Sequence, residues 1–421
     1  MGSRNHIHLI LGRLPRSVYL GKDVRHSSRQ IVRILKRLGH QFVAHDEEAQ
    51  FYFSRERYRK ARVHPEVLQA ARCLMAWGPD NALAWQESPA YNGVPICLTG
   101  NGRIDLMRPE LRSLHEAKAK ELRAKFGSIV LINTNFGALN HFYTNLTVLA
   151  PPEELGAAEN TWEAGLSHHR YTIFRAFLSL LPRLAARFPR TTFILRPHPG
   201  ENHQTWVDAA QGAKNVHVSH EGSVIPWILA SEALIHNGCT TGLEAYILDG
   251  QPIAYQPAVS ETYDLHLPNA LSSIVHDEAA LFALVESIVL KKFDLKSLHT
   301  PKRTALLANH VSATHGQLAS ERIADAIAEV AAVANLSKQA RPAQLFAGFI
   351  HAEARAFLKR LHMNRQGHKG NIAYTKHRFP DTPLTEVQAR VADFSKALGR
   401  FHAVKVEQYD DNIFSICTVA T

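Results

Sequence analysis

Two short segments of the chain combine residue types that bind phosphate, and the first is RPHPG, Arg196 to Gly200. It directly follows a predicted strand over residues 192–196. A guanidinium matches phosphate oxygens in geometry, and the prolines on either side of His198 fix the backbone around its imidazole. Because α/β proteins bind ligands where their strands end, we expect Arg196 and His198 to bind a phosphate. His198 is also a candidate catalytic residue.

The second segment is EALIHNGCTTGLEA, residues 232–245. A predicted strand ends at His236, and Cys239 then opens a helix that ends at Gly250. Unpaired amides at a helix start, together with threonine hydroxyls, form an anion site. A plain N-cap threonine and a glutamate that only complements the helix dipole also explain the pattern. From this segment we assign five residues to substrate binding: Asn237, Gly238, Thr240, Thr241 and Glu244.

The candidate general base lies in the first half of the chain, in the sequence HDEEA. It places Asp46 and Glu47 at the end of a predicted strand over residues 40–45, where a carboxylate can face a cleft. Clustered like charges raise one another's pKa, which suits a general base near neutral pH. An exposed acidic loop is the alternative interpretation. Asn133 and Asn135 end another predicted strand and are candidates for binding sugar or acceptor hydroxyls.

Other catalytic motifs are absent from the sequence. There is no Walker A motif, and GNGRID at residues 100–105 lacks the third glycine of a dinucleotide fingerprint. The histidine pairs at 198 and 203 and at 217 and 220 lack a third ligand at a spacing that suits a metal. We therefore predict neither a metal nor a cofactor.

Short apolar strands alternate with helices along most of the chain, which indicates parallel sheets covered on both faces. The run HIHLILG at residues 6–12 is a predicted first strand, and residues 27–39 are a predicted helix closed by Gly39. Two such series predict an α/β protein of two Rossmann-like, doubly wound domains that face a cleft. We place one domain at 1–126, a second at 127–335 and a helical, basic extension at 336–421.

Several of these segments together resemble the surface carbohydrate biosynthesis protein family, which is GT-B glycosyltransferase-like. They are HDEEA, LMAWG, TGNGRIDLMRPELR, VLINTNFG, RPHPGEN and HNGCTTGLEA. The His-Pro turn followed by a hydroxyl pair is also similar to bacterial sialyl- and Kdo-type CMP-sugar transferases. That resemblance implies that His198, Thr240 and Thr241 hold the donor phosphate. Thr240 and Thr241 stand where many such enzymes have serines. This change keeps the hydroxyl groups but does not specify which nucleotide is bound.

The resemblance implies a metal-independent glycosyltransferase of bacterial surface polysaccharide assembly, with a nucleotide sugar as donor and a glycan or lipid-linked acceptor. Arg196, His198 and the amides of residues 239–241 would stabilise the charge left on the phosphate. Three alternatives remain: a CDP-glycerol-type glycerophosphotransferase, an NDP-sugar 2-epimerase-like enzyme, and a non-catalytic scaffold of envelope assembly. The sequence does not decide between them.

The charge of the chain favours acidic partners, since 48 basic against 38 acidic residues leave a net charge of +10. The densest basic cluster is Arg55 to Arg62, which is either a solvated helix face or a patch for anionic lipid headgroups. No apolar run approaches the ~20 residues of a membrane-spanning helix, and four scattered cysteines suit a reducing compartment. We expect a cytoplasmic protein that associates peripherally with the anionic inner face of the cytoplasmic membrane and does not bind nucleic acid.

Overall fold

The computed structural model describes residues 4–418 except 49–51, 144, 146, 148, 150–160, 334–340, 369 and 379. The chain forms two compact units. Unit 1 comprises Met1–Leu114 and Ala308–Thr421, and unit 2 is the continuous stretch His115–Leu307. The sequence prediction divided the chain at 126 and 335 instead. It missed that the chain returns to unit 1 after Leu307.

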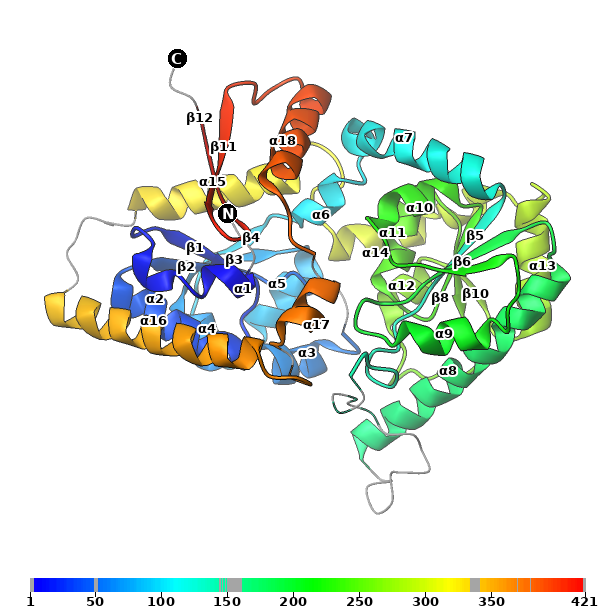
Figure 1. The fold of residues 1–421 in the computed structure, drawn as a ribbon, viewed down its shortest axis with the longest axis horizontal. Helices are drawn as coiled ribbons and strands as arrows, with labels where there is room; N and C mark the ends of the chain where they lie inside the picture. The colour runs from blue at the N-terminus through cyan, green and yellow to red at the C-terminus, as the bar shows by residue number, and fades with distance from the viewer. Residues whose placement is uncertain are drawn as a thin grey trace. The chain divides into compact units, whose positions relative to one another are not determined.

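Four parallel strands in the order β1-β2-β3-β4 form the sheet of unit 1: β1 (Val18–Gly21), β2 (Gln41–His45), β3 (Ala71–Ala76) and β4 (Ile96–Leu98). The helices between these strands are α2 (Arg29–Leu38), α3 (Arg55–Arg62), α4 (Pro65–Ala70) and α5 (Pro79–Gln86). The opposite face is covered by α15 (Ala319–Val333), where Ala326 packs against Val43, Cys73 and Met75 (Figure 1). This contact explains why residues 319–333 belong to unit 1.

The start of the chain differs from the prediction. Residues 6–12 are not a strand, because α1 (Arg4–Ile7) and the 3-10 helix η1 (Leu11–Arg13) occupy this stretch. A short alternation of apolar and polar residues does not distinguish a strand from helical turns. The predicted helix that follows is confirmed as α2. It ends at Gly39, whose φ of 79° is the left-handed conformation that glycine adopts most easily. A second 3-10 helix, η2 (His26–Ser28), precedes it.

Six parallel strands form the sheet of unit 2, in the order β10-β9-β8-β5-β6-β7. Their bounds are β5 (Ile129–Asn133), β6 (Thr192–Arg196), β7 (Val216–Val218), β8 (Ala233–His236), β9 (Pro252–Tyr255) and β10 (Ser273–Val275). Along the chain the strands first extend to one side of β5 and then, from β8 onward, to the other. The order therefore reverses between β5 and β8, and both predicted parallel α/β domains are confirmed. The order in unit 1 shows no such reversal.

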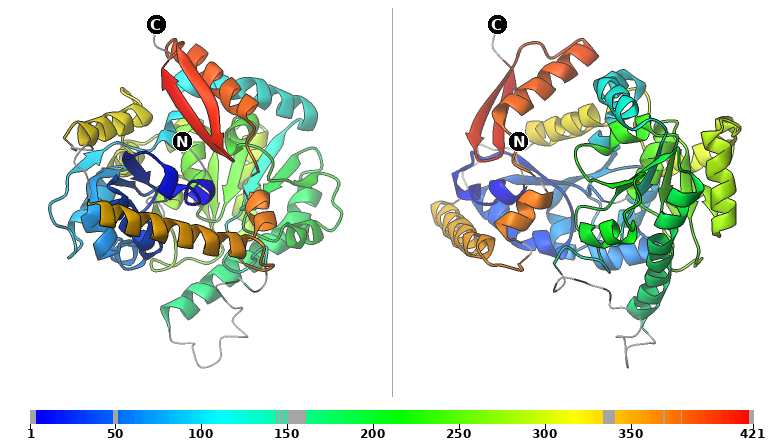
Figure 2. Two further views of the ribbon diagram at one scale, coloured as in Figure 1. Left: turned by 60° about the vertical axis from the view of Figure 1, so that its left-hand side comes forward. Right: turned by 45° about the vertical axis from the view of Figure 1, so that its right-hand side comes forward.

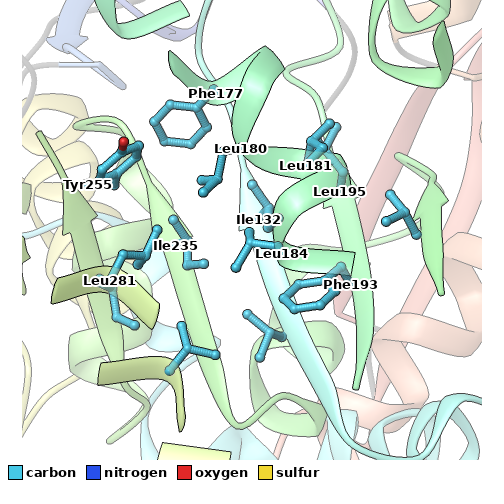
Figure 3. Close-up of a cluster of buried hydrophobic side chains, with 14 of the residues drawn as sticks. Ile132, Phe177, Leu180, Leu181, Leu184, Phe193, Leu195, Ile235, Tyr255 and Leu281 are labelled. Carbon is cyan, nitrogen blue, oxygen red and sulfur yellow. The ribbon is translucent and has the colours of Figure 1, made fainter. Parts of the chain in front are cut away.

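Helices cover both faces of this second sheet. One layer is α8 (Trp162–Arg187), α9 (His203–Ala209) and α13 (Glu278–Val289), and the other includes α10 (Val224–Ala230), α11 (Thr240–Ile247) and α12 (His266–Ala270). Figure 3 shows Phe177, Leu180 and Leu184 of α8 packed against Ile132 and Ile235 of the central strands. All five side chains are fully buried. This core fixes the positions of the strand ends that carry the predicted site.

The remaining elements connect or extend these layers. They are α6 (Gly102–Asp105), α7 (Pro109–Phe126), the 3-10 helix η6 (Leu295–Leu298), α14 (Pro301–His310), α16 (Pro342–Met363), α17 (Ile372–Arg378), α18 (Leu384–Leu398) and an antiparallel hairpin of β11 (Val404–Asp410) and β12 (Ile413–Thr418). The predicted extension at 336–421 is thus helical over much of its length and also contains a hairpin. Within the described residues, no helix combines the length and apolar character needed to cross a membrane.

Candidate functional site

Three strands of unit 2 end side by side in polar residues. Asn133 of β5 lies in register with Arg196 of β6 on one side and with His236 of β8 on the other. All three side chains are buried, with 6%, 7% and 0% of their surfaces exposed. Two of them were assigned to the site from the sequence. The reversal of strand order falls at the same place, and such a switch point is where open α/β sheets bind ligands.

A pocket of unit 2 opens beside this switch point and encloses about 350 Å³ of empty space, part of it open to solvent. It is bordered by residues of α8, by the loop at residues 256–265 and by the ends of β8 and α12. The polar lining residues are His169, Arg170, Asn237, Tyr255, Gln256, Tyr263, Asp264 and Asn269. Of the predicted residues, Asn237 lies in the lining, and a Cβ on Gly238 would be 3.5 Å from the Asn269 amide oxygen.

Several buried amide oxygens at this pocket and strand end lack hydrogen-bond partners. They are the side-chain oxygens of Asn133, Asn237 and Asn269, and Asn269 is only 6% exposed. Leaving a buried polar atom without a partner costs about 1–3 kcal/mol. Three such atoms near one pocket therefore indicate a ligand or ordered water that would satisfy them.

Two charged groups of the pocket come from α8. Arg170 donates to the backbone carbonyl of Asn135, 3.1 Å away, and burial lowers the pKa of its guanidinium. His169 places its Nε2 2.7 Å from Oδ1 of Asp264, whose other oxygen accepts from the backbone N–H of Ser260. A carboxylate at this distance fixes the orientation of the imidazole ring.

The predicted phosphate ligand His198 lies in a turn with a defined hydrogen-bond pattern. Its Nδ1 accepts from the backbone N–H of Gly200, 3.1 Å away, so the neutral ring carries its proton on Nε2. The side chain is exposed. Gly137, in the loop after β5, is close enough that an added Cβ would lie 3.8 Å from Nδ1 of His198. The His198 ring thus lies beside the loop that follows β5.

Glu201, which the sequence analysis did not select, holds this turn in place. Its carboxylate is fully buried and accepts from the backbone N–H groups of His198 and Phe136, from the Thr134 hydroxyl and from the Trp206 indole. Burial raises the pKa of Glu201 to about 6, while these four donors act in the opposite direction. The residue links the His198 turn to the loop that follows β5.

Arg196 has a different environment from the one expected. Its guanidinium donates to the backbone carbonyls of His220, Glu221 and Gly222, at 2.8–3.2 Å. It also lies over the Trp227 ring, 5.3 Å from the ring centroid. Burial lowers the pKa of Arg196 to about 10. In this structure the side chain anchors the loop after β7, and it does not line the pocket.

The helix α11 begins where the sequence predicted, with Cys239 as the N-cap and no side-chain cap bond. The Thr241 hydroxyl lies 2.7 Å from the Cys239 thiol, and burial raises the pKa of that thiol to about 11. Thr241 and Glu244 are buried, whereas Thr240 is half-buried. The three predicted residues thus lie together on the first turns of α11, and Thr240 is the most accessible of them.

His236, which no sequence argument selected, determines how α11 packs. Its Nδ1 accepts from the Gly238 N–H at 3.0 Å, and its Nε2 donates to the Ser272 hydroxyl at 2.8 Å. Burial lowers the pKa of His236 to about 3. A Cβ on Gly242 would lie 2.5 Å from Nε2 of His236, so the helix can reach the ring only because residue 242 is glycine.

The predicted general bases lie in unit 1. Asp46 is fully buried and accepts from Arg62 through both oxygens, at 2.6 and 3.0 Å, and from the Tyr58 hydroxyl at 3.0 Å. Glu47 is exposed. The acidic cluster does not raise the pKa of its third member: although burial acts to raise it, Arg25 and Arg62 lower the pKa of Glu48 to about 2. Asp46 is therefore part of a buried ion pair.

The sequence analysis did not identify the polar residues that line the pocket from distant parts of the chain. His169 and Arg170 are adjacent on α8, but Asp264 follows almost a hundred residues later, and no spacing rule connects them. Glu201 is the exception, since a carboxylate three residues after His198 is within reach of the backbone of the same turn. That spacing could have suggested its role.

Comparisons with known proteins give similarity of fold only. No protein-family model matches the chain, and no curated protein does. The wall teichoic acid polymerase TagF aligns over 69% of this chain and 68% of its own, with 11% identity and a TM-score of 0.43. In a TagF structure soaked with CDPG, the aligned part spans 58% of that chain.

Two further structures belong to the same group of neighbours. MnaA of S. aureus, solved with UDP, aligns over 79% of this chain and 80% of its own, with 12% identity and a TM-score of 0.45. The UDP-GlcNAc 2-epimerase of Neisseria meningitidis, bound to UDP-GlcNAc, aligns over 74% and 76%, with 12% identity and a TM-score of 0.42. Similarity at this level carries neither activity nor substrate to this protein.

Proposed function

We propose that the protein is a transferase of surface-polysaccharide assembly that uses a nucleotide-activated donor, and that unit 2 binds the donor. The observation that carries the proposal is the pocket at the switch point between β5 and β8, where buried amide oxygens lack partners. A nucleotide supplies hydroxyl and amino donors for such oxygens. Its phosphates would lie toward the donors at the neighbouring strand ends.

Transfer from a nucleotide-activated donor leaves negative charge on the phosphate, and unit 2 offers three kinds of group to stabilise it. The exposed His198 ring carries its proton on Nε2, the first turn of α11 directs backbone N–H groups toward its start, and Arg170 contributes a half-buried positive charge. Fixed donors of this kind stabilise developing charge without reorganising during the reaction. The proposal omits Arg196, since its donors already bind the loop after β7.

The proton of the acceptor hydroxyl needs a base, and His169 is the group in the pocket best suited to take it. Asp264 lies 2.7 Å from its Nε2 and would hold the ring in place for proton transfer. Asp46 is less suited to this role, because proton uptake would weaken its bidentate pairing with Arg62. We therefore propose His169, oriented by Asp264, in place of the carboxylates predicted from the sequence.

The same pair favours a second candidate, an epimerase that acts on a nucleotide sugar without an acceptor. Such an enzyme needs acid and base groups within the donor pocket itself, and His169 with Asp264 meets part of that requirement. The two candidates differ in a measurable way. An epimerase converts the donor alone, whereas a transferase releases nucleotide only when an acceptor hydroxyl is present.

Nucleotide binding tests the proposal directly. CMP, CDP and UDP are titrated into the full chain by calorimetry, and at least one should bind and raise the melting temperature. Arg170→Gln should weaken that binding by roughly ten- to a hundred-fold, the value of a hydrogen bond to a charged group. Arg175→Gln, an exposed residue of the same helix, is the matched control and should not change it. If no nucleotide binds, or if both variants bind as tightly as the wild type, the proposal fails.

A further inference from the structure

The helix α16 of unit 1 buries small residues and exposes large apolar ones. The face that packs against α2 is made of small residues, and Gly348, Ala352 and Ala356 are buried there. A Cβ on Gly348 would lie 2.9 Å from Cβ of Arg37, so the two helices are in close contact. Figure 2 shows α16 on the outside of unit 1. Several of its large apolar side chains are exposed.

The outward face carries a continuous stripe of large apolar residues. The spacing of four, seven and four residues places them on one side of a helix. They are Phe346, Ile350, Phe357 and Leu361, exposed by 67%, 51%, 60% and 54%, with Leu358 beside them at 56%. Surface helices ordinarily bury their large apolar residues and expose polar ones. A stripe of this kind in contact with water indicates a surface that another apolar medium covers.

The segment that contains α16 carries a net positive charge. Between residues 342 and 368 the sequence contains four basic residues, Arg355, Lys359, Arg360 and Arg365, and one acidic residue, Glu353, for a net charge of 4 − 1 = +3. An apolar stripe on a helix of net positive charge, flanked here by the exposed Arg360, is the pattern of helices that lie in the interface of an anionic bilayer. Two copies of this surface would instead repel each other when brought together.

The basic cluster of α3, which suggested membrane binding from the sequence, is largely neutralised within unit 1. Its ion pairs are Arg55 with Asp80 and Glu87, Arg59 with Glu87, Lys60 with Glu56, and Arg62 with Asp46 and Glu48. Paired charges contribute little to the attraction of a distant anionic surface. The geometry points to α16 instead: we propose that its outward face docks unit 1 onto an anionic lipid bilayer, with the apolar stripe inserted at the level of the headgroups.

Vesicle sedimentation of the full chain tests this proposal. We expect binding to phosphatidylcholine vesicles that contain about 30% phosphatidylglycerol, and much weaker binding to pure phosphatidylcholine. Phe357→Ser with Leu361→Ser should reduce binding by about tenfold or more. The matched control is Val259→Ser with Leu290→Ser, which removes side chains of similar exposure (64% and 52%) from unit 2 and should leave binding unchanged.

Charge variants separate the two contributions of α16. Arg360→Glu with Arg365→Glu should weaken binding to the anionic vesicles and reduce its dependence on salt, whereas Lys60→Glu on α3 should not. Phe357→Trp should retain binding, because tryptophan suits the bilayer interface. Melting temperatures of all variants check the fold. The proposal is overturned if the wild type does not bind anionic vesicles, if the α16 variants bind as well as the wild type, or if Phe357→Ser instead dissolves a dimer.

Discussion

Two histidines of unit 2 lie in turns with the same hydrogen bond but differ in how deeply they are buried. His198-Pro199-Gly200 follows β6 and His236-Asn237-Gly238 ends β8, and in each turn the Nδ1 atom accepts from the glycine N–H two residues later. His198 is exposed, whereas His236 is fully buried between α11 and Ser272. A shared hydrogen bond thus fixes the same tautomer in both turns, and burial decides what the Nε2–H group can reach.

The largest difference should appear in stability. His236→Ala removes a fully packed ring and leaves the buried Gly238 N–H without its acceptor, so we expect a loss of about 3–5 kcal/mol in the free energy of unfolding. His198→Ala should lose less than about 0.5 kcal/mol, because its ring is exposed. Urea unfolding of both variants measures the contrast. Equal losses would contradict the distinction between the two turns.

A double variant sharpens the result for His236. Gly242→Ala alone should cost about 1–3 kcal/mol, because its Cβ would overlap the His236 ring. When the ring is absent, the added methyl group enters the vacated space. The loss in His236→Ala with Gly242→Ala should therefore be smaller than the sum of the two single losses. Simple additivity would show that the ring does not restrict residue 242.

Arg196 tests whether the residue before the His198 turn belongs to the site or to the scaffold. Arg196→Gln removes the donors to the carbonyls at 220–222, and we expect a loss of about 1.5–3 kcal/mol in stability. The affinity for the cognate nucleotide should change by less than about threefold, corresponding to under ~1 kcal/mol. A large loss of affinity with unchanged stability would restore the interpretation of Arg196 as a phosphate ligand.

The exposed turn should show the opposite behaviour from the buried one. His198→Ala removes one hydrogen bond to a charged phosphate, so nucleotide affinity should fall by roughly ten- to a hundred-fold while the melting temperature of the free protein barely changes. Calorimetry and thermal unfolding on the same sample give both numbers. A sharp drop in melting temperature with unchanged affinity would make His198 a purely structural residue.

The smallest effect concerns pH, where His236 and Glu201 act in opposite directions. The pKa of His236 is lowered to about 3, so protonation of the unfolded chain reduces stability as pH falls below 6.5. The pKa of Glu201 is raised to about 6, so its contribution to stability increases as pH falls from 6 toward 4.5. Between pH 7 and 5 these amount to a loss of about 2 and a gain of about 1 kcal/mol.

Comparison of two proteins isolates the histidine contribution. In the wild type the two groups together should lower stability by about 1 kcal/mol from pH 7 to 5, and in His236→Gln only the gain from Glu201 remains. The change with pH should therefore differ by about 2 kcal/mol between the two proteins when unfolding is measured at both values. The same pH dependence in both would mean that His236 is not buried as a neutral ring.

The sequence predicted the parts of this fold that are determined locally. The strands before Asn133, Arg196 and His236, the start of α11 and the end of α2 at Gly39 follow from apolar runs, turn residues and caps. The strand predicted at residues 6–12 was wrong, because its alternation of apolar and polar residues was too short to distinguish a strand from helical turns. The predicted domain boundaries do not include the return of α15 to the first sheet. That contact joins residues about 250 to 280 positions apart in the sequence.

For the candidate site, too, the sequence predicted only what is determined locally. The sequence suggested that Asn133, His198 and Asn237 lie at strand ends, but it could not show that Arg196 turns toward the loop after β7 or that Arg62 holds Asp46. The direction of a long side chain depends on neighbours that the fold brings from elsewhere. His169 pairs with Asp264, and the neighbouring Tyr263 packs against Gly165, where an added Cβ would collide with the tyrosine.

The discontinuity of unit 1 has a consequence for how the protein is made. The strands β1 to β4 leave the ribosome before unit 2, but α15, which covers Val43 and Met75, is synthesised some 250 residues after them. Unit 2 is continuous and can form its core during that interval, because domains generally fold as units during synthesis. One apolar face of the sheet of unit 1 therefore remains exposed to water until unit 2 has been synthesised. The sheet of unit 1 is thus translated before unit 2 but is fully enclosed only after it.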